Sequence, residues 1–206
     1  MTRLGFVINL DSCADNRGCM VACKAKTASF IGSHFIETHT AIGGEYPHPN
    51  TYFVPVLCRH CENPSCVAAC PKGVLVKDPQ TGIVAVGDVS LCESCEGKPC
   101  VAACPLGNID LDPVTGRIGK CDMCADRLAQ GLPPACFVSC LTRSIMFGDL
   151  ENPEDPAAQL LEMGNAMGIV HTFDAGENGD SAVHYLMGKH EWQDAEGLYS
   201  PAWKNS

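Results

Sequence analysis

The residues in this sequence best suited to chemistry are its fifteen cysteines, which fall into four groups. The second and third groups both follow the pattern C-x2-C-x4-C-x3-C-P, the fourth follows C-x2-C-x11-C-x3-C, and every group ends in C-x3-C. In chain order the members are Cys13, Cys19 and Cys23; Cys58, Cys61, Cys66 and Cys70; Cys92, Cys95, Cys100 and Cys104; and Cys121, Cys124, Cys136 and Cys140. Thiolates at such spacing are ligands for soft metals or metal–sulfur clusters.

Three kinds of chemistry use closely spaced cysteines: disulfides, structural zinc and iron–sulfur clusters. Disulfides are disfavoured because the cysteine count is odd and because we expect no export signal in residues 1–11, MTRLGFVINLD. Zinc sites use C-x2-C pairs but do not account for the repeated C-x3-C-P ending. Iron–sulfur clusters account for both, since the bacterial run C-x2-C-x2-C-x3-C-P sends its fourth cysteine to a second cluster. We therefore predict iron–sulfur clusters and keep a zinc-binding structural module as the alternative.

The spacing also predicts the local structure around each cluster. A C-x2-C pair in a turning loop directs two thiolates to one metal centre. A C-x3-C pair places two thiolates at i and i+4 on one face of a helix, so the second reaches a neighbouring cluster. Proline after the last cysteine, as at Pro71 and Pro105, ends that helix. We thus expect short helices that run between clusters.

The two middle groups belong to an internal repeat with an offset of 34 residues. The string CVAACP occurs in both copies, and DPQTG at 78–82 corresponds to DPVTG at 112–116. These turn residues predict a hairpin between strands at 74–77 and 83–86, and a second between 108–111 and 117–119. Further short strands are expected near residues 4–10 and 144–147. The predicted fold class is α+β: short antiparallel strands with short helices beside the clusters.

The segments outside the cysteine groups differ in character. Residues 24–57 form an insertion in which glycines and prolines at 43–49 indicate a loop. Residues 149–206 carry eleven acidic and two basic side chains, and the whole chain has a formal charge of −10, which argues against nucleic acid as a partner. Asp155-Pro156 predicts the start of a helix. An apolar stripe along that helix, either packed on the core or free to dock a partner, comprises Leu160, Met163, Met167 and Val170.

The arrangement resembles the four-cluster ferredoxin-type subunit of molybdopterin oxidoreductases, the family of the dimethyl sulfoxide, polysulfide and nitrate reductase iron–sulfur subunits. The resemblance covers residues 3–148. It depends on the order of the four groups, on CRHCENPSCVAACP at 58–71 and on KCDMCADRLAQGLPPACFVSC at 120–140. The long gap between Cys124 and Cys136 is its most specific mark.

The resemblance implies that groups one and four share two clusters, and that groups two and three share two others. The implied ligand sets are Cys58, Cys61, Cys66 and Cys104; Cys92, Cys95, Cys100 and Cys70; Cys121, Cys124, Cys136 and Cys23; and Cys13, Cys19 and Cys140. It also implies two ferredoxin modules, each with two clusters. Module A would comprise residues 1–50 and 107–148 and module B residues 51–106, followed by an acidic C-terminal extension at 149–206.

The last ligand set departs from the family, because the expected fourth cysteine is replaced by Asn16. Three [4Fe-4S] clusters are therefore expected with a fourth, atypical one. That site could hold [4Fe-4S] with a non-cysteine ligand, for which Asn16 and Asp15 are candidates, or [3Fe-4S], or no cluster. A histidine between two ligands, His60, is expected to pack near a cluster rather than bind it.

No catalytic motif accompanies the cysteines, so one-electron transfer is the chemistry expected of the chain. By resemblance it would be the electron-transfer subunit of a complex whose large subunit carries molybdopterin with molybdenum or tungsten, in anaerobic respiration. A membrane anchor or a cytochrome would be the other electron partner. No apolar run is long enough to span a membrane, and the location would be cytoplasmic, or exported with a signal-bearing partner. A free polyferredoxin carrier is the alternative.

Overall fold

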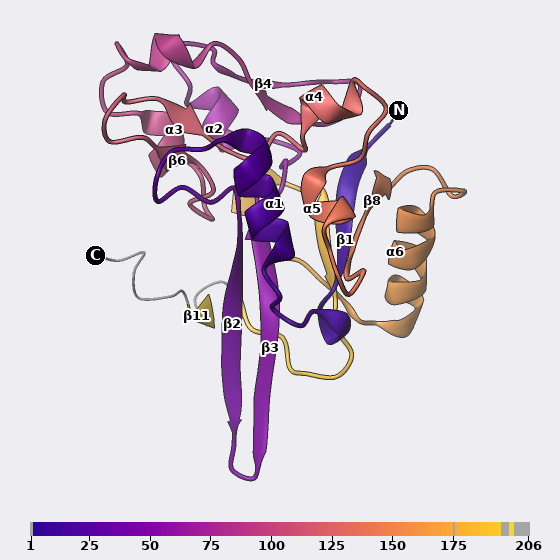
Figure 1. The fold of residues 1–206 in the computed structure, drawn as a ribbon. Coiled ribbons are helices and arrows are strands. Elements are labelled where there is room, and N and C mark those ends of the chain that lie inside the picture. The colour runs from indigo at the N-terminus through magenta and orange to yellow at the C-terminus, as the bar shows by residue number, and fades with distance from the viewer. Residues whose placement is uncertain (1, 175, 195–197, 200–206) are drawn as a thin grey trace.

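The computed structural model describes residues 2–174, 176–194 and 198–199, and its largest sheet has four strands (Figure 1). The order is β8 (Ile145–Asp149), β1 (Leu4–Asn9), β10 (Val183–Leu186) and β9 (Val170–His171). β1 is antiparallel to β8 and parallel to β10. Because β1 is covered on both faces, it is a continuous apolar segment rather than an alternating one. The strands expected near residues 4–10 and 144–147 are confirmed.

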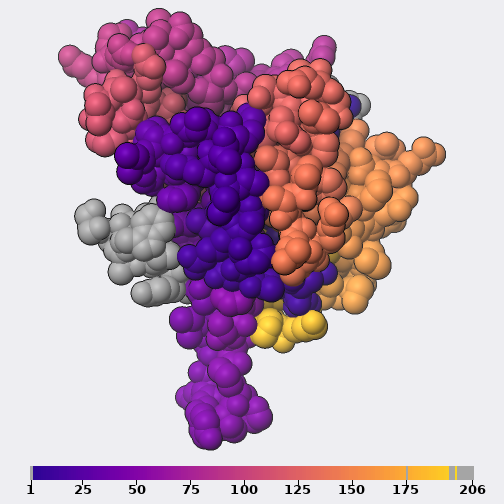
Figure 2. All heavy atoms as spheres, viewed as in Figure 1, coloured from indigo at the N-terminus to yellow at the C-terminus, as the bar shows by residue number. Residues whose placement is uncertain are grey.

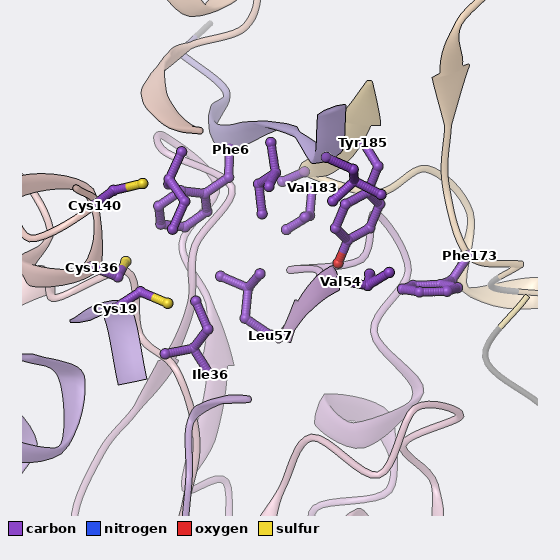
Figure 3. Close-up of a cluster of buried hydrophobic side chains, with 14 of the residues drawn as sticks. Phe6, Cys19, Ile36, Val54, Leu57, Cys136, Cys140, Phe173, Val183 and Tyr185 are labelled. Atoms are coloured by element: carbon purple, nitrogen blue, oxygen red, sulfur yellow. The ribbon is translucent and has the colours of Figure 1, made fainter. Parts of the chain in front are cut away.

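The two faces of this sheet pack against different elements. Phe6 and Ile8 face the main core together with Ile36, Leu57 and Tyr185. A close-up of this core has Cys19, Cys136 and Cys140 along one side (Figure 3). On the opposite face Val7 packs with Ala157 of helix α6 (Pro156–Met167) and with Leu186. The cysteine-containing segments therefore lie on one side of the sheet and α6 on the other.

Helix α6 begins where the sequence predicts, but its buried face differs from the predicted stripe. The Asp155 carboxylate accepts a hydrogen bond from the Ala157 N–H at 2.8 Å, and Pro156 is the first helical residue. Leu160 packs on the sheet as expected, whereas Met163 and Met167 are exposed. The face turns because Gly164 lies so close to Leu186 that a Cβ there would be 2.5 Å from Leu186 Cδ2.

Removing the Asp155 carboxylate tests how the helix is joined to the sheet. Its second oxygen accepts the Asp149 N–H at 2.9 Å, so it satisfies donors on both α6 and β8. Asp155→Ala should lower the free energy of unfolding by ~1–2 kcal/mol, measured by denaturant titration. The matched control is Glu154→Ala, which removes an exposed neighbouring carboxylate and should change stability by less than ~0.5 kcal/mol. Equal effects of the two variants would contradict this role.

The C-terminal segment enters the main sheet, a feature that no pattern in the sequence predicts. β10 inserts between β1 and β9, with Phe6 opposite Val183 and Ile8 opposite Tyr185. The buried Tyr185 hydroxyl donates to the Pro55 carbonyl at 3.0 Å. Residues from the acidic extension are therefore part of the core.

The segment expected as a loop before the second cysteine group is a long hairpin, so that expectation was wrong. β2 (Ile36–Glu45) pairs with β3 (His48–Leu57) along ten residues of each strand, and β11 (Leu198–Tyr199) adds a short third strand beside β2. Its base is buried, while its tip projects from the body of the protein (Figure 2). Glycine and proline crowd only the tip, and the apolar residues nearer the base form the strands. The expected boundary at residues 50 and 51 falls within β3.

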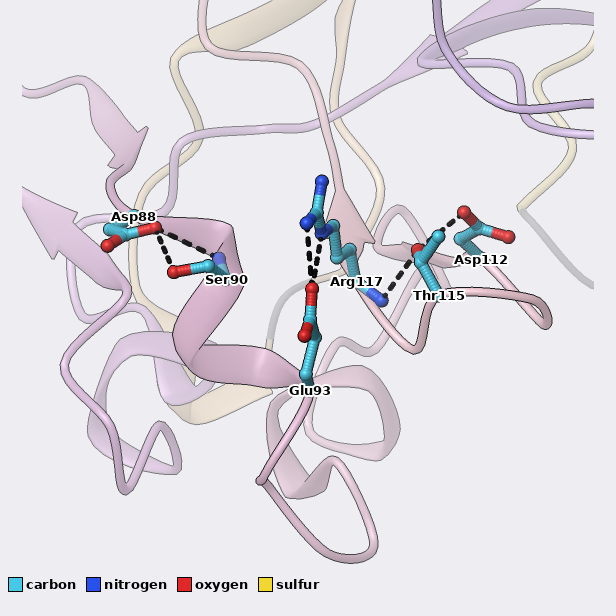
Figure 4. Close-up of polar contacts among 6 residues, drawn as sticks. All are labelled: Asp88, Ser90, Glu93, Asp112, Thr115 and Arg117. Atoms are coloured by element: carbon cyan, nitrogen blue, oxygen red, sulfur yellow. Dashed lines mark hydrogen bonds and ion pairs between the residues drawn. The ribbon is translucent and has the colours of Figure 1, made fainter.

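The repeated segment forms the two hairpins that its turns predict. β4 (Leu75–Lys77) pairs with β5 (Val84–Val86), and β6 (Asp110–Leu111) pairs with β7 (Ile118–Gly119). In the second turn the Thr115 hydroxyl donates to Asp112 at 2.6 Å, and Arg117 pairs with Glu93 at 2.7 Å (Figure 4). The first turn repeats this bond between Thr81 and Asp78, also at 2.6 Å.

The remaining elements are short helices. They are η1 (Leu10–Ser12), α1 (Gly18–Thr27), α2 (Ser65–Ala68), η2 (Val89–Cys92), α3 (Pro99–Ala102), α4 (Ala125–Leu128), α5 (Ala135–Val138) and η3 (Gly176–Asn178). α1 packs beside α5, and α2 packs beside α3. The protein is thus a small mixed α and β structure with short strands and few helices, consistent with a ferredoxin-type domain.

Candidate iron–sulfur cluster sites

All fifteen cysteines lie in the described part of the chain, and none of them is in a disulfide. The third cysteine of each of the last three groups lies on a one-turn helix: Cys66 on α2, Cys100 on α3 and Cys136 on α5. The fourth cysteine of each group follows directly after that turn. Leu141 follows Cys140 in place of the usual proline, and α5 still ends at Val138. Proline is therefore not required to end these helices.

Four thiols from the two repeats line one cavity. It contains about 400 Å³ of empty space, counting its open side, and its cysteines are Cys58, Cys61, Cys66 and Cys104. The first three come from one repeat, and Cys104 comes from the other. Neighbouring thiolates act on one another here: burial first, and then the charges of Cys58 and Cys104, raise the pKa of Cys66 to about 11. The packing of α2 beside α3 brings the two repeats together.

A second cavity joins the first cysteine group to the fourth. It contains about 340 Å³ of empty space, and its cysteines are Cys23, Cys121, Cys124 and Cys136. Its other walls include the apolar side chains of Phe6, Ile36 and Leu57. Burial, followed by the charges of Cys124 and Asp122, raises the pKa of Cys23 to about 12. The packing of α1 against α5 accounts for this contact between segments more than 100 residues apart.

The other cysteines form two further neighbourhoods. Burial and then the charges of Cys70, Cys92 and Cys95 raise the pKa of Cys100. In the second neighbourhood, burial raises the pKa of Cys19 to about 11, and the charges of Cys13 and Cys140 act in the same direction. The thiols that act on Cys100 and on Cys19 are thus members of the sets that the family resemblance implies.

The neighbourhoods also contact one another in a fixed order. After burial, the largest effect on the pKa of Cys121 comes from the charge of Cys58, which lines the other cavity. The charge of Cys19 likewise helps raise the pKa of Cys136. The two middle groups are joined through the i, i+4 pairs on α2 and α3. The order is Cys13/Cys19/Cys140, the second cavity, the first cavity, and Cys70/Cys92/Cys95/Cys100.

Asn16 lies apart from this chemistry. Its side chain is exposed, and its carboxamide oxygen accepts the Gly18 N–H at 2.9 Å at the start of α1. Asp15 pairs with Arg17 at 3.1 Å, and its charge and its backbone N–H both affect the pKa of Cys13. Asn16 therefore uses its oxygen within the loop, while Asp15 is nearer to a thiol.

Backbone N–H groups repeat a contact that the sequence analysis missed. Val74, Asn108 and Ser144 each donate to the sulfur four residues earlier, at 3.3, 3.3 and 3.2 Å; the acceptors are Cys70, Cys104 and Cys140. Around Cys70, burial opposes ionisation but several N–H groups outweigh it, so the pKa of this thiol is lowered. Backbone donors of this kind stabilise thiolates, and no side-chain pattern predicts them.

Lysines hold the loops that carry the ligands. Lys77 donates to the Cys61 carbonyl at 2.7 Å, Lys98 to the Cys92 and Cys95 carbonyls at 2.5 Å, and Lys120 to the Cys121 carbonyl at 2.5 Å. His60 is buried, and its Nδ1 accepts the Val84 N–H at 2.9 Å, so this ring packs as expected.

The grouping of the thiols bears on which metal they hold. Among the described residues, no three His, Cys, Asp or Glu side chains are placed to hold a single metal ion. A zinc site needs four ligands around one ion, whereas a cluster spreads its thiolates over several iron atoms. The thiol-lined cavities therefore fit clusters better than zinc, and they define the chain as an iron–sulfur protein.

Comparison with known proteins agrees with this class. Residues 49–150 match the family described as 4Fe-4S dicluster domain. The chain is 28% identical to the arsenate respiratory reductase iron-sulfur subunit ArrB of Shewanella sp. (strain ANA-3), over 80% of this chain and 89% of that protein. It is 32% identical to one chain of the anaerobic dimethyl sulfoxide reductase of Escherichia coli K12, over 73% and 75%. Against one subunit of the sulfite dehydrogenase of Allochromatium vinosum the identity is 32%, over 75% and 72%.

The chain therefore belongs to this family of iron–sulfur subunits of oxidoreductases. It binds [4Fe-4S] clusters and transfers electrons, and catalysis is the role of another subunit. In the part of the chain that the structure describes, no helix is long and apolar enough to cross a membrane.

Proposed function

We propose that this chain conducts electrons along four clusters between a redox donor or acceptor and a large molybdopterin subunit. The observation that carries the proposal is that each of two cavities is lined by four thiols from separate parts of the chain. The proposed ligand sets are Cys58/Cys61/Cys66/Cys104, Cys70/Cys92/Cys95/Cys100, Cys23/Cys121/Cys124/Cys136 and Cys13/Cys19/Cys140. When bound, the clusters would supply the one-electron chemistry, and this chain's residues hold and insulate them.

The contacts between neighbourhoods support a linear path with two terminal clusters. One end is the site of Cys13, Cys19 and Cys140, and the other is the site of Cys70, Cys92, Cys95 and Cys100. Two ferredoxin modules, residues 1–50 with 107–148 and residues 51–106, would each hold two clusters. The extension at 149–206 supports module A by placing β10 beside β1.

The terminal site with three cysteines would hold the atypical cluster. Because the Asn16 oxygen already accepts a backbone hydrogen bond, we infer that three thiolates hold this cluster and that Asn16 shapes the loop. Either [3Fe-4S] or [4Fe-4S] with one iron open to water or to Asp15 is compatible with that set. Losing one thiolate removes negative charge, so the potential of this cluster should exceed that of a four-thiolate cluster in the same place.

The partner is proposed from the relatives, which are named as parts of arsenate, dimethyl sulfoxide and sulfite oxidoreductases. A large subunit with molybdenum or tungsten bound to pterin would meet one end of the path. A cytochrome or membrane anchor would meet the other. The complex would work in the cytoplasm, or outside it if the partner carries the export signal.

Anaerobic affinity purification from the native host tests this assignment. We expect the chain to co-purify in a fixed ratio with a much larger polypeptide, and the eluate to contain iron, sulfide and molybdenum or tungsten. A brown, monodisperse chain that elutes alone would favour the free polyferredoxin carrier instead. A colourless zinc-loaded protein would contradict the proposal.

Paired cysteine substitutions test the ligand sets through iron content. If Cys66 and Cys104 bind the same cluster, Cys66→Ala/Cys104→Ala should lose no more iron than Cys66→Ala alone. The matched pair Cys66→Ala/Cys70→Ala touches two clusters and should lose about twice as much. The opposite result would mean that each repeat holds its own cluster. Electron paramagnetic resonance (EPR) of the remaining clusters controls for loss of the fold.

A further inference from the structure

Arg59 stands between two proposed ligands, Cys58 and Cys61, and its charge has no protein partner. The side chain is buried, with 3% of its surface exposed. Its Nη1 donates to the Phe173 carbonyl, whereas Nε and Nη2 have no hydrogen-bond acceptor among the described residues. An arginine remains charged in proteins, and burying a charge without a counter-charge is strongly unfavourable. Some group that the protein chain does not itself supply must therefore offset this cation.

The surroundings of Arg59 indicate what that group is. Arg59 lines the cavity that also contains the thiols of Cys58, Cys61, Cys66 and Cys104. No carboxylate is among the described residues that line it. A second buried cation, Lys120, lines the same cavity and donates only to the Val84 and Cys121 carbonyls. The only anions available there are the thiolates and the cluster that they would bind.

The neighbouring cavity has the opposite character. The described residues around Cys23, Cys121, Cys124 and Cys136 include Asp122 and no lysine or arginine. The nearest cation that acts on Cys23 is Lys26, and it is paired with Asp126 at 2.5 Å. The two adjacent sites therefore have the same set of four thiols but differ in the sign of the nearby fixed charge.

We propose that Arg59 is the built-in counter-charge of the Cys58/Cys61/Cys66/Cys104 cluster and raises its reduction potential above that of the Cys23/Cys121/Cys124/Cys136 cluster. This inference rests on the proposed function. A [4Fe-4S] cluster with four thiolates is a dianion when oxidised and a trianion after it accepts one electron from the neighbouring cluster. A fixed buried cation stabilises the trianion more than the dianion, so the electron is held more tightly. The step moves one electron and requires no proton.

The test is an anaerobic redox titration of the iron-loaded protein followed by EPR, with Arg59→Gln compared with Arg59→Lys. Loss of the charge should lower the midpoint of one signal, the signal that Cys66→Ala abolishes. At the wild-type midpoint, the ratio of reduced to oxidised cluster should fall about tenfold, equivalent to ~59 mV for one electron. Arg59→Lys keeps the charge and should restore most of the shift. Arg117→Gln removes an exposed arginine paired with Glu93 and should change nothing in that signal.

The outcomes separate this inference from the proposed function. An unchanged midpoint in Arg59→Gln with full iron content would overturn it, as would an equal shift in Arg59→Lys. If Arg59→Gln fails to load iron, the wild-type protein still decides, because the signal lost in Cys66→Ala must then titrate at a higher potential than the signal lost in Cys124→Ala. The reverse order would overturn the inference. Wild-type protein that binds no iron would instead refute the proposed function.

Discussion

Removing iron with a chelator, anaerobically and with reductant present, should unfold residues 58–119 while the main sheet remains folded. In this segment the sheets have two strands and the α-helices one turn, and neither is stable alone. Its core has eight buried residues, and three of them are the proposed ligands Cys66, Cys92 and Cys100. Clusters would therefore supply much of the stability here, as metals do in other small domains.

Amide hydrogen exchange measures this expectation directly. After iron removal, amides of β4 to β7 should exchange ~100-fold faster or more, whereas those of β1 and β10 should keep most of their protection. The main sheet belongs to a core of twenty buried residues, most of them not cysteine, which survives better without metal. Protein in the same buffer without chelator is the control. Retained protection in β4 to β7 after complete iron loss would show that the segment folds without clusters.

Asn16→Cys should convert the atypical cluster into one with four thiolates. The substitution restores the spacing C-x2-C-x2-C-x3-C in the first group, and residue 16 lies in the same loop as Cys13 and Cys19. A fourth thiolate adds negative charge, so the midpoint of this cluster should fall by ~59 mV or more, a tenfold change in its oxidised to reduced ratio. If the native site holds [3Fe-4S], its EPR signal should be replaced by that of a reduced [4Fe-4S] cluster.

The matched control for this substitution is Asn16→Ala. It removes the bond to the Gly18 N–H and no proposed thiolate, so the type of cluster should not change. A cluster that is lost or converted in Asn16→Ala would show that the carboxamide is itself a ligand. An unchanged spectrum in iron-replete Asn16→Cys would show that residue 16 cannot reach the cluster.

Local features of this protein were predictable because they depend on residues near in sequence. The hairpin turns at Asp78 and Asp112 follow from their own side chains, which bond to Thr81 and Thr115. The start of α6 follows from Asp155. The hairpin formed by β2 and β3 was mistaken for a loop because the glycines and prolines of its tip were taken to describe the whole segment. The exposure of Met163 and Met167 depends on where Gly164 meets Leu186, which periodicity does not reveal.

The sequence by itself determined that the chain has four groups of thiolate ligands, a duplicated hairpin unit and short helices beside the clusters, because spacing along the chain governs each of these. Only the tertiary structure decided which distant thiols face the same cavity, how β10 enters the sheet beside β1, and that Arg59 is buried with two donors unpaired. Those features depend on packing between segments far apart in sequence. The charge around each cluster, and thus the expected order of potentials, is a property of that packing.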